Sequence, residues 1–177
     1  MKIRGKTIRL GDNIDTDVII PARYLVTHDA ATLAKHVFED YYPEFRIKAA
    51  EGAVIIAGEN FGLGSSREHA AIALKHSGVK AIVAKSFARI FYRNSINIGL
   101  PALVLRERGV FDRLLEGDEV ELDIAKGVLT IVKTGETFSC DKMPEFMMKI
   151  IEAGGLVNYF KKKSGENQWK ARPDNYL

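Results

Sequence analysis

Apolar and polar positions divide this chain of 177 residues into two parts with different periodicity. In its middle, short apolar runs alternate with segments in which apolar residues recur at helical spacing. The runs 53–57, 79–84 and 102–105 predict strands, and the segments 66–77 and 86–98 predict helices. A β-α-β-α-β order of this kind is typical of a parallel sheet.

After Gly117 the period changes to two, which is typical of half-buried strands. Residues 120–124 and 128–132, separated by a turn at Lys126-Gly127, predict an antiparallel hairpin, and Gly135 turns the chain again. We therefore expect an α/β fold with a mainly parallel sheet, flanked by helices, and antiparallel hairpins beside it. Four further elements are expected: a strand near a sheet edge within 1–10, a weak helix over 30–38, a turn at 41–45 and a helix from Pro144.

One domain, residues 1–160, accounts for these elements, because the chain is long enough to bury a single core. Residues 161–177 are polar, begin with three lysines and predict an extended tail. No apolar run reaches the roughly 20 residues that span a bilayer, and residues 1–5 lack the apolar core of a signal peptide. We expect a cytoplasmic protein that has no membrane partner.

Charge and cysteine content narrow the function classes. The formal net charge of +3 is a weak bias that does not predict a nucleic-acid partner. The single cysteine, Cys140, excludes an internal disulfide and any multi-thiolate metal site made by this chain alone. Its position after a predicted strand favours a structural role. The four histidines lack the spacing of a metal site, so no metal ligand is predicted.

A glycine-rich stretch, residues 58–69, joins the first predicted strand of the parallel part to its helix. This order directs backbone N–H groups at whatever occupies the loop, which favours a carboxylate-bearing substrate. Arg67 stands where a dinucleotide-binding loop has its third glycine, and neither a Walker loop nor a nucleophile elbow is present. Ser65 and Glu68 have capping-box spacing, so Ser65 has a simpler interpretation, as a helix cap.

Three aspartates, Asp12, Asp15 and Asp17, form an acidic loop after the first predicted strand. A calcium loop would need a glycine and a closing glutamate at offsets where this chain has neither. For Asp12 and Asp15 we favour a structural interpretation, in which each carboxylate accepts hydrogen bonds from the backbone of its own turn.

Several separated blocks of the sequence resemble the swivelling domain of the aconitase superfamily. They occur in the family's order and extend the similarity over most of residues 1–157. The length and start of the chain also resemble free-standing small subunits of 3-isopropylmalate dehydratases. The blocks are 12–17, 20–25, 62–71 and 84–91.

The resemblance implies a swivelling β/β/α domain and a hydro-lyase of leucine biosynthesis that acts only with a large subunit. That subunit would hold a [4Fe-4S] cluster, and this chain would bind none. The substrate would be a hydroxy-dicarboxylate. Ser65 would be the base that removes the carbon-bound proton. The residues around it would bind or brace the substrate: Ser66 and Arg67 bind a carboxylate, while Thr16, Asp17 and Gly64 line or support the site.

Substrate choice rests on residues 24–27. Relatives that act on tricarboxylic acids have an arginine at the position of Val26, where it pairs with the extra carboxylate. Val26 and Thr27 instead suit an apolar group such as isopropyl, although Arg23 is near enough in sequence to reach in. Citramalate, 2,3-dimethylmalate and homoaconitate stay open as substrates. A non-catalytic anion- or RNA-binding module, and self-association of the isolated chain, also stay open.

Overall fold

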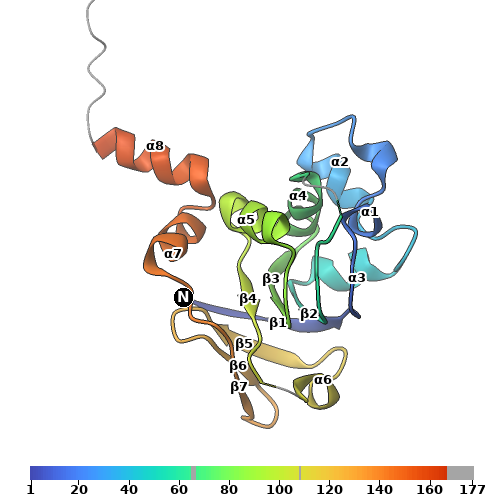
Figure 1. Ribbon diagram of the computed structural model, residues 1–177, viewed down its shortest axis with the longest axis vertical. Coiled ribbons are helices and arrows are strands. Elements are labelled where there is room, and N and C mark those ends of the chain that lie inside the picture. The colour runs from blue at the N-terminus through green and yellow to red at the C-terminus, as the bar shows by residue number, and fades with distance from the viewer. Residues whose placement is uncertain (65–66, 108, 167–177) are drawn as a thin grey trace, which may run out of the picture.

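A single mixed sheet organises the chain. The structure, a computed structural model, describes residues 1–64, 67–107 and 109–166. Within these residues the strand order is β4-β3-β2-β1-β5-β6-β7. Strands β1 to β4 are parallel, and β5 to β7 extend the sheet as antiparallel hairpins (Figure 1). The predicted α/β fold is confirmed. The strands are β1 (Lys2–Arg9), β2 (Ala53–Ala57), β3 (Val79–Ala84), β4 (Ala102–Val104), β5 (Glu119–Asp123), β6 (Val128–Ile131) and β7 (Thr137–Ser139).

Strand β1 joins the two halves of the sheet. Residues 2–6 pair antiparallel with β5, and residues 6–9 pair in parallel with β2. The expectation of an edge strand within residues 1–10 is therefore wrong. The charged residues that suggested an edge alternate along the strand and find partners on its neighbour; Lys2 Nζ, for example, lies 2.6 Å from Glu121 Oε1.

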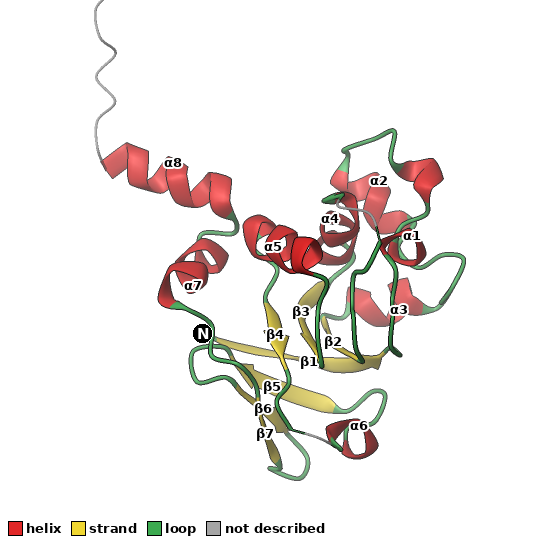
Figure 2. Ribbon diagram, in the orientation of Figure 1, coloured by secondary structure: helices red, strands yellow, loops and turns green. Residues whose placement is uncertain are grey.

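Side chains of β2 alternate between two cores, one on each face of the sheet. Figure 2 shows the helices α1 to α4 grouped apart from α7 and α8 around this sheet. Ile55 belongs to the core covered by α1 to α4, whereas Val54 and Ile56 belong to the core formed with α5, α7 and the hairpins. A strand that is covered on both faces reads as a continuous apolar run, and all of β2 is buried. The helices are α1 (Thr16–Ile19), α2 (Ala30–Lys35), α3 (Phe45–Ala50), α4 (His69–His76), α5 (Arg89–Ile98), α6 (Val110–Arg113), α7 (Glu145–Glu152) and α8 (Leu156–Glu166), with a 3₁₀ turn, η1 (Ala22–Tyr24).

The strands of the parallel part lie where the sequence predicts them, but both of its helices begin three residues later than predicted. Helix α4 begins at His69 rather than at residue 66, and α5 begins at Arg89 rather than at residue 86. Before α5 the chain is held in a loop, because the N–H of Ala88 donates to the carbonyl of Phe61 at 3.0 Å. That bond holds the backbone beside the glycine-rich stretch instead of in a helical turn.

The start of the predicted tail is helical. Residues 161–166 continue α8, so the extended conformation predicted for them is wrong. Leu156 and Tyr159, three residues apart, both pack on the core that contains Val54 and Ile56. This helical spacing begins α8, and the lysines continue the same helix. Residues 167–177 lie outside the described residues, and the division of the chain at residue 160 stays a prediction.

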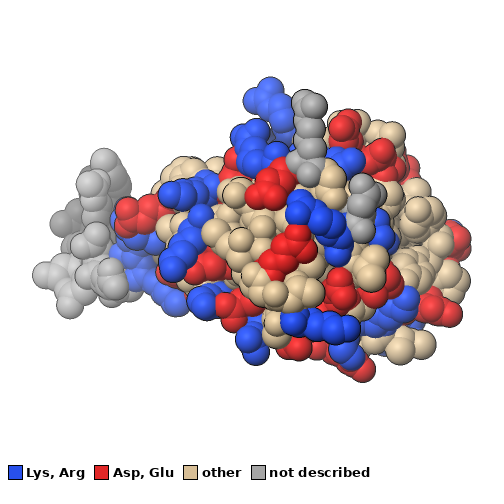
Figure 3. Space-filling view, turned by 90° about the horizontal axis from the view of Figure 1, so that it is seen from below, with Lys and Arg blue, Asp and Glu red and all other residues tan. Residues whose placement is uncertain are grey.

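Charges of both signs share the surface. Arg106 Nη2 lies 2.6 Å from Asp141 Oδ2, and Arg113 Nη1 lies 2.5 Å from Glu136 Oε1. On the face shown in Figure 3, cations and carboxylates are intermingled. In the described part of the chain, no helix combines the length and the apolar character needed to cross a membrane.

Candidate active site

Three loops meet at the carboxyl edge of the parallel strands. They are residues 11–15 after β1, residues 58–64 after β2 (the glycine loop) and residues 85–88 after β3. The glycine loop lies in the middle and is bonded to the loop on each side. Ligands of open α/β sheets bind outside the carboxyl ends of the strands, so this edge is the candidate site. The joining backbone bonds are Asn13 N–H to Glu59 O (2.7 Å), Gly62 N–H to Ile14 O (2.8 Å), Thr16 N–H to Leu63 O (2.8 Å), Phe61 N–H to Ser86 O (3.0 Å) and Ala88 N–H to Phe61 O (3.0 Å).

Two glycines let the chain follow this path. Gly62 has φ +78°, and a Cβ there would lie 2.1 Å from Cγ of Phe91. Gly64 has φ +97°, and a Cβ there would lie 2.5 Å from a carboxylate oxygen of Asp15. Any side chain at either position would combine strained backbone with a steric clash.

The acidic loop supports the glycine loop. The carboxylate of Asp15 caps α1 by accepting the N–H of Asp17 at 2.7 Å, so its predicted role in its own turn is confirmed. Asp12 behaves differently, because its carboxylate accepts the N–H of Glu59 at 2.8 Å. The prediction that Asp12 serves its own turn is therefore wrong, since its partner lies in the neighbouring loop.

The predicted base and its neighbour, Ser65 and Ser66, lie outside the described residues. Arg67 follows them and is exposed, two residues before α4 begins. The residue at the N-cap position of α4 is Glu68, which makes no side-chain capping bond. The helix therefore begins at residue 69 and not at residue 66, and the predicted cap, Ser65, lies outside the described residues.

The two residues predicted to support the site, Thr16 and Asp17, follow the acidic loop at the start of α1. Thr16 is buried and is joined to the glycine loop through its backbone N–H, which donates to the carbonyl of Leu63. Asp17 is exposed and follows in the first turn of α1. Their predicted supporting roles stay predictions, although Thr16 contacts the loop that leads to Ser65.

The segment after η1 presents its predicted substrate-facing residue to solvent. The side chain of Val26 is 92% exposed, so it does not pack on this chain. Thr27 Oγ1 accepts the N–H of Asp29 at 3.1 Å. Arg23 forms ion pairs with Glu39 and Asp40. Its guanidinium is therefore already engaged, which disfavours the alternative that Arg23 binds a third carboxylate of the substrate.

An arginine that the sequence analysis missed lies at this edge. A cavity of about 370 Å³ is lined by Gly62, Gly64, Ala88, Arg89 and Ile90. Arg89 is exposed at the first position of α5, and it also lines the adjoining cavity. The available signal was its place in the block 84–91, next to the glycine loop only in the folded chain. A guanidinium there is suited to binding a carboxylate.

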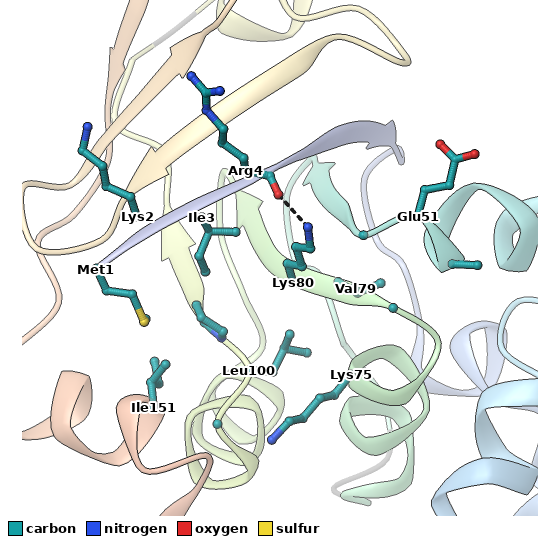
Figure 4. Close-up of a pocket in the computed structure, with 15 residues that line it drawn as sticks. Met1, Lys2, Ile3, Arg4, Glu51, Lys75, Val79, Lys80, Leu100 and Ile151 are labelled. Carbon is teal, nitrogen blue, oxygen red and sulfur yellow. Dashed lines mark hydrogen bonds between the residues drawn. The ribbon is translucent and has the colours of Figure 1, made fainter.

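A larger cavity, of about 750 Å³, lies at the opposite, amino edge of the parallel strands (Figure 4). Its cations serve the fold. Lys80 Nζ donates to the carbonyl of Arg4 at 3.0 Å, and Lys75 Nζ donates to the carbonyls of Ile98 and Gly154. Burial lowers the pKa of Lys75. Because these amines satisfy backbone carbonyls between elements, we assign the cavity no part in the chemistry.

The donor set of this chain does not fit an iron–sulfur cluster. Burial, with the nearby Asp141 and Glu107, raises the pKa of Cys140 to about 12, which disfavours the thiolate that a metal requires. Within residues 1–64, 67–107 and 109–166, no three His, Cys, Asp or Glu side chains are grouped so that they could hold a metal ion.

Comparisons with known proteins identify the family of this chain. Residues 5–108 match the family described as the aconitase C-terminal domain. The chain belongs to this family. A relative from Nautilia profundicola, described as a 3-isopropylmalate dehydratase small subunit, is 54% identical over 166 residues, which cover 94% of this chain and 98% of the relative. A relative from Aquifex aeolicus with the same description is 54% identical over 164 residues, which cover 92% and 96%.

A solved structure shares the whole fold. The crystal structure of a protein from Methanocaldococcus jannaschii, described as 3-isopropylmalate dehydratase, superimposes with a TM-score of 0.87 at 46% identity. The match covers 97% of this chain and 100% of that one. The predicted resemblance to the swivelling domain of the aconitase superfamily is confirmed, and the enzymes of this family are iron–sulfur dehydratases.

Replacing Gly62 tests how strictly the glycine loop is held. In Gly62→Ala we expect a loss of about 2–5 kcal/mol in the free energy of unfolding, from a positive φ together with the clash at Phe91. Gly135→Ala is the control, because Gly135 has φ +72° but open space around its Cβ position. Urea unfolding of both variants measures the difference; equal losses would show that packing against Phe91 is unimportant.

Proposed function

We propose that this chain is the small subunit of a heteromeric hydro-lyase that interconverts 2-isopropylmalate and 3-isopropylmalate by dehydration and rehydration in leucine biosynthesis. One observation carries the proposal: the glycine loop, bonded to a loop on each side, reaches Gly64 at the carboxyl edge of the sheet, and in the sequence Ser65, Ser66 and Arg67 follow it directly. The relatives named above, described as small subunits of this enzyme, support it over nearly their full length. Nothing observed favours another malate or an RNA.

The partner of this chain is a large subunit that holds the [4Fe-4S] cluster. Such a cluster supplies a Lewis acid, and its place on the partner leaves proton transfer and substrate binding to this chain. The single buried Cys140 agrees with that division. The exposed positions of Arg67 and Val26 also agree with a site that a second protein completes.

In this division of roles Ser65 takes the carbon-bound proton. A serine hydroxyl is a poor base, and positioned N–H donors offset that cost by about 3–4 kcal/mol each at most. The late start of α4 places the helix terminus beyond Arg67. Arg67 and the amides of the loop are therefore the groups that stabilise negative charge beside Ser65. The guanidinium of Arg67 also binds a substrate carboxylate in a bidentate manner.

Val26 forms the apolar part of the substrate site. Its side chain stands almost wholly in solvent over the described part of the chain, so the isopropyl group of the substrate and the large subunit are its partners. A valine there rejects a third carboxylate, because burying an unpaired charge is costly.

Reconstitution tests the proposal most directly. The chain, combined anaerobically with a cluster-bearing large subunit, is expected to convert 2-isopropylmalate to 3-isopropylmalate. A panel of citramalate, 2,3-dimethylmalate and homoaconitate measures its preference. Turnover of another malate without activity on isopropylmalate would overturn the substrate assignment.

Removing the proposed base should stop the reaction. In Ser65→Ala we expect normal assembly with the large subunit and a fall in kcat of at least about 10³-fold, since proton abstraction loses its acceptor. Ser139→Ala, on the exposed face of β7, is the control and is expected to keep normal turnover. Near-normal turnover in Ser65→Ala would end the assignment of Ser65.

Changing Val26 should change the substrate. In Val26→Arg we expect activity on homoaconitate to appear and kcat/KM for isopropylmalate to fall about tenfold or more, because a cation replaces an apolar contact. Val26→Leu, which keeps the apolar character, should retain the isopropylmalate preference. An unchanged preference in Val26→Arg would contradict the role given to this segment.

Arg89 should bind the second carboxylate of the substrate. In Arg89→Gln we expect KM to rise about 10- to 100-fold, the range of a lost charged hydrogen bond. Arg93→Gln is the matched control, because Arg93 is exposed one turn further along α5 and lines neither cavity beside the glycine loop. Equal KM values in the two variants would exclude Arg89 from the site.

A further inference from the structure

Two histidines connect the segment that carries Val26 to the start of α4. The ring of His28 lies 4.7 Å from the ring of His69, centroid to centroid, with an interplanar angle of 35°. His69 is the first residue of α4 and follows Arg67 by two positions. The contact therefore joins the two parts of the chain to which we assign substrate recognition.

The side chain of His69 is buried at the start of α4, against the segment that carries Val26. It is 9% exposed, and within the described residues neither Nδ1 nor Nε2 meets the geometry of a hydrogen bond, although the backbone of Thr27 lies close enough to act on the ring. Thr27 and His28 therefore both approach His69 from the segment that carries Val26. Within the described residues, its clearest directional contact is the ring of His28.

The surroundings of His69 favour an uncharged ring. Burial and the charge of His28 lower its pKa, as does Arg67, and they outweigh Glu68 and the backbone of Thr27, which favour protonation. An uncharged ring at His69 contacts the ring of His28 without charge repulsion between the two. Contacts of this kind are specific in geometry and add modestly to area burial.

Local bonds alone leave the segment weakly tied to the site. The N–H of Thr27 donates to the carbonyl of Tyr24 at 3.4 Å, and Thr27 Oγ1 accepts the N–H of Asp29, so both bonds stay within the segment. The side chain of Val26 is free in solvent. The contacts of the adjoining turn η1 reach residues 36–40, since Arg23 pairs with Glu39 and Asp40 and the ring of Tyr24 stacks on that of His36. The contact of His28 with His69 instead connects the segment to the start of α4, two residues after Arg67.

We propose that His69, through its tilted ring contact with His28, is a positioning residue that holds Val26 and Thr27 in register with Arg67. This inference rests on the proposed function, because it assigns the position of a segment that contacts the substrate. Without the ring contact, the segment keeps more freedom before binding and loses it when substrate binds, so the cost falls on KM. The chemical step, carried by other residues, is not affected.

Kinetics of the reconstituted heteromer with 2-isopropylmalate test the inference. In His28→Ala we expect KM to rise roughly 3- to 10-fold, the range of a lost aromatic pair, with kcat changed less than about twofold. His28→Phe and His69→Phe keep a ring at each position and are expected to keep KM near the unmodified value. His76→Ala, at the other end of α4, is the control, since His76 Nδ1 contacts the carbonyl of Ile72 within its own helix.

A double-variant cycle separates positioning from general stability. His69→Ala and His28→Ala remove the same contact, so the double variant should raise KM no further than either single variant. His28 is exposed, which keeps the test decisive if His69→Ala fails to fold. An unchanged KM in His28→Ala, or effects that multiply in the double variant, would overturn the inference. The unmodified heteromer reports separately on the proposed function, because that proposal fails if it shows no turnover.

Discussion

The site depends on a backbone-to-backbone connection between three loops at the carboxyl edge of the sheet. The glycine loop is bonded on one side to the acidic loop and on the other to the residues before α5, so it acts as a short continuation of the sheet beyond β2. Backbone hydrogen bonds hold these three loops together, so the arrangement restricts the side chain at only a few positions of the glycine loop. A residue at position 62 must leave room for Phe91, and one at position 64 must leave room for the carboxylate of Asp15. These contacts hold the backbone of the glycine loop as far as Gly64, the residue before Ser65 in the sequence.

The sequence predicts the strands of the parallel sheet better than the points at which its helices begin. The run at 53–57 was unambiguous, because a strand that is buried on both faces has no polar positions to confuse its period. The starts of α4 and α5 were misplaced for a physical reason. Ser86 has the residue type of a helix cap, but its carbonyl accepts a hydrogen bond from Phe61, a contact between residues 25 positions apart that no local pattern contains. Ser65 and Glu68 matched a capping box by spacing alone.

The candidate site residues also divide into those whose contacts are local in the sequence, which could be predicted, and those whose contacts join distant segments, which could not. Asp15 was predictable, because a carboxylate that caps its own turn is a local event. Asp12 was not, because it bonds the backbone of Glu59 across the sheet edge. Arg89 reaches the glycine loop only through the parallel pairing of β2 and β3, which brings two loops together. The role of Ser65 came from family resemblance, since residue pattern alone favoured a cap.

An open edge is a constraint on the chemistry as well as on assembly. Arg67 and Arg89 are exposed, and Val26 stands almost wholly in solvent. In water, a guanidinium interacts with a carboxylate weakly, and a serine hydroxyl has almost no tendency to give up its proton. Closure by a second protein changes both conditions, because excluding water strengthens each electrostatic contact while the loop already holds its donors in place. A rigid loop on one chain and a closing surface on another are therefore complementary requirements. For the proton transfer proposed above, the first would reduce the reorganisation needed at the moment of transfer, and the second would make a weak base usable.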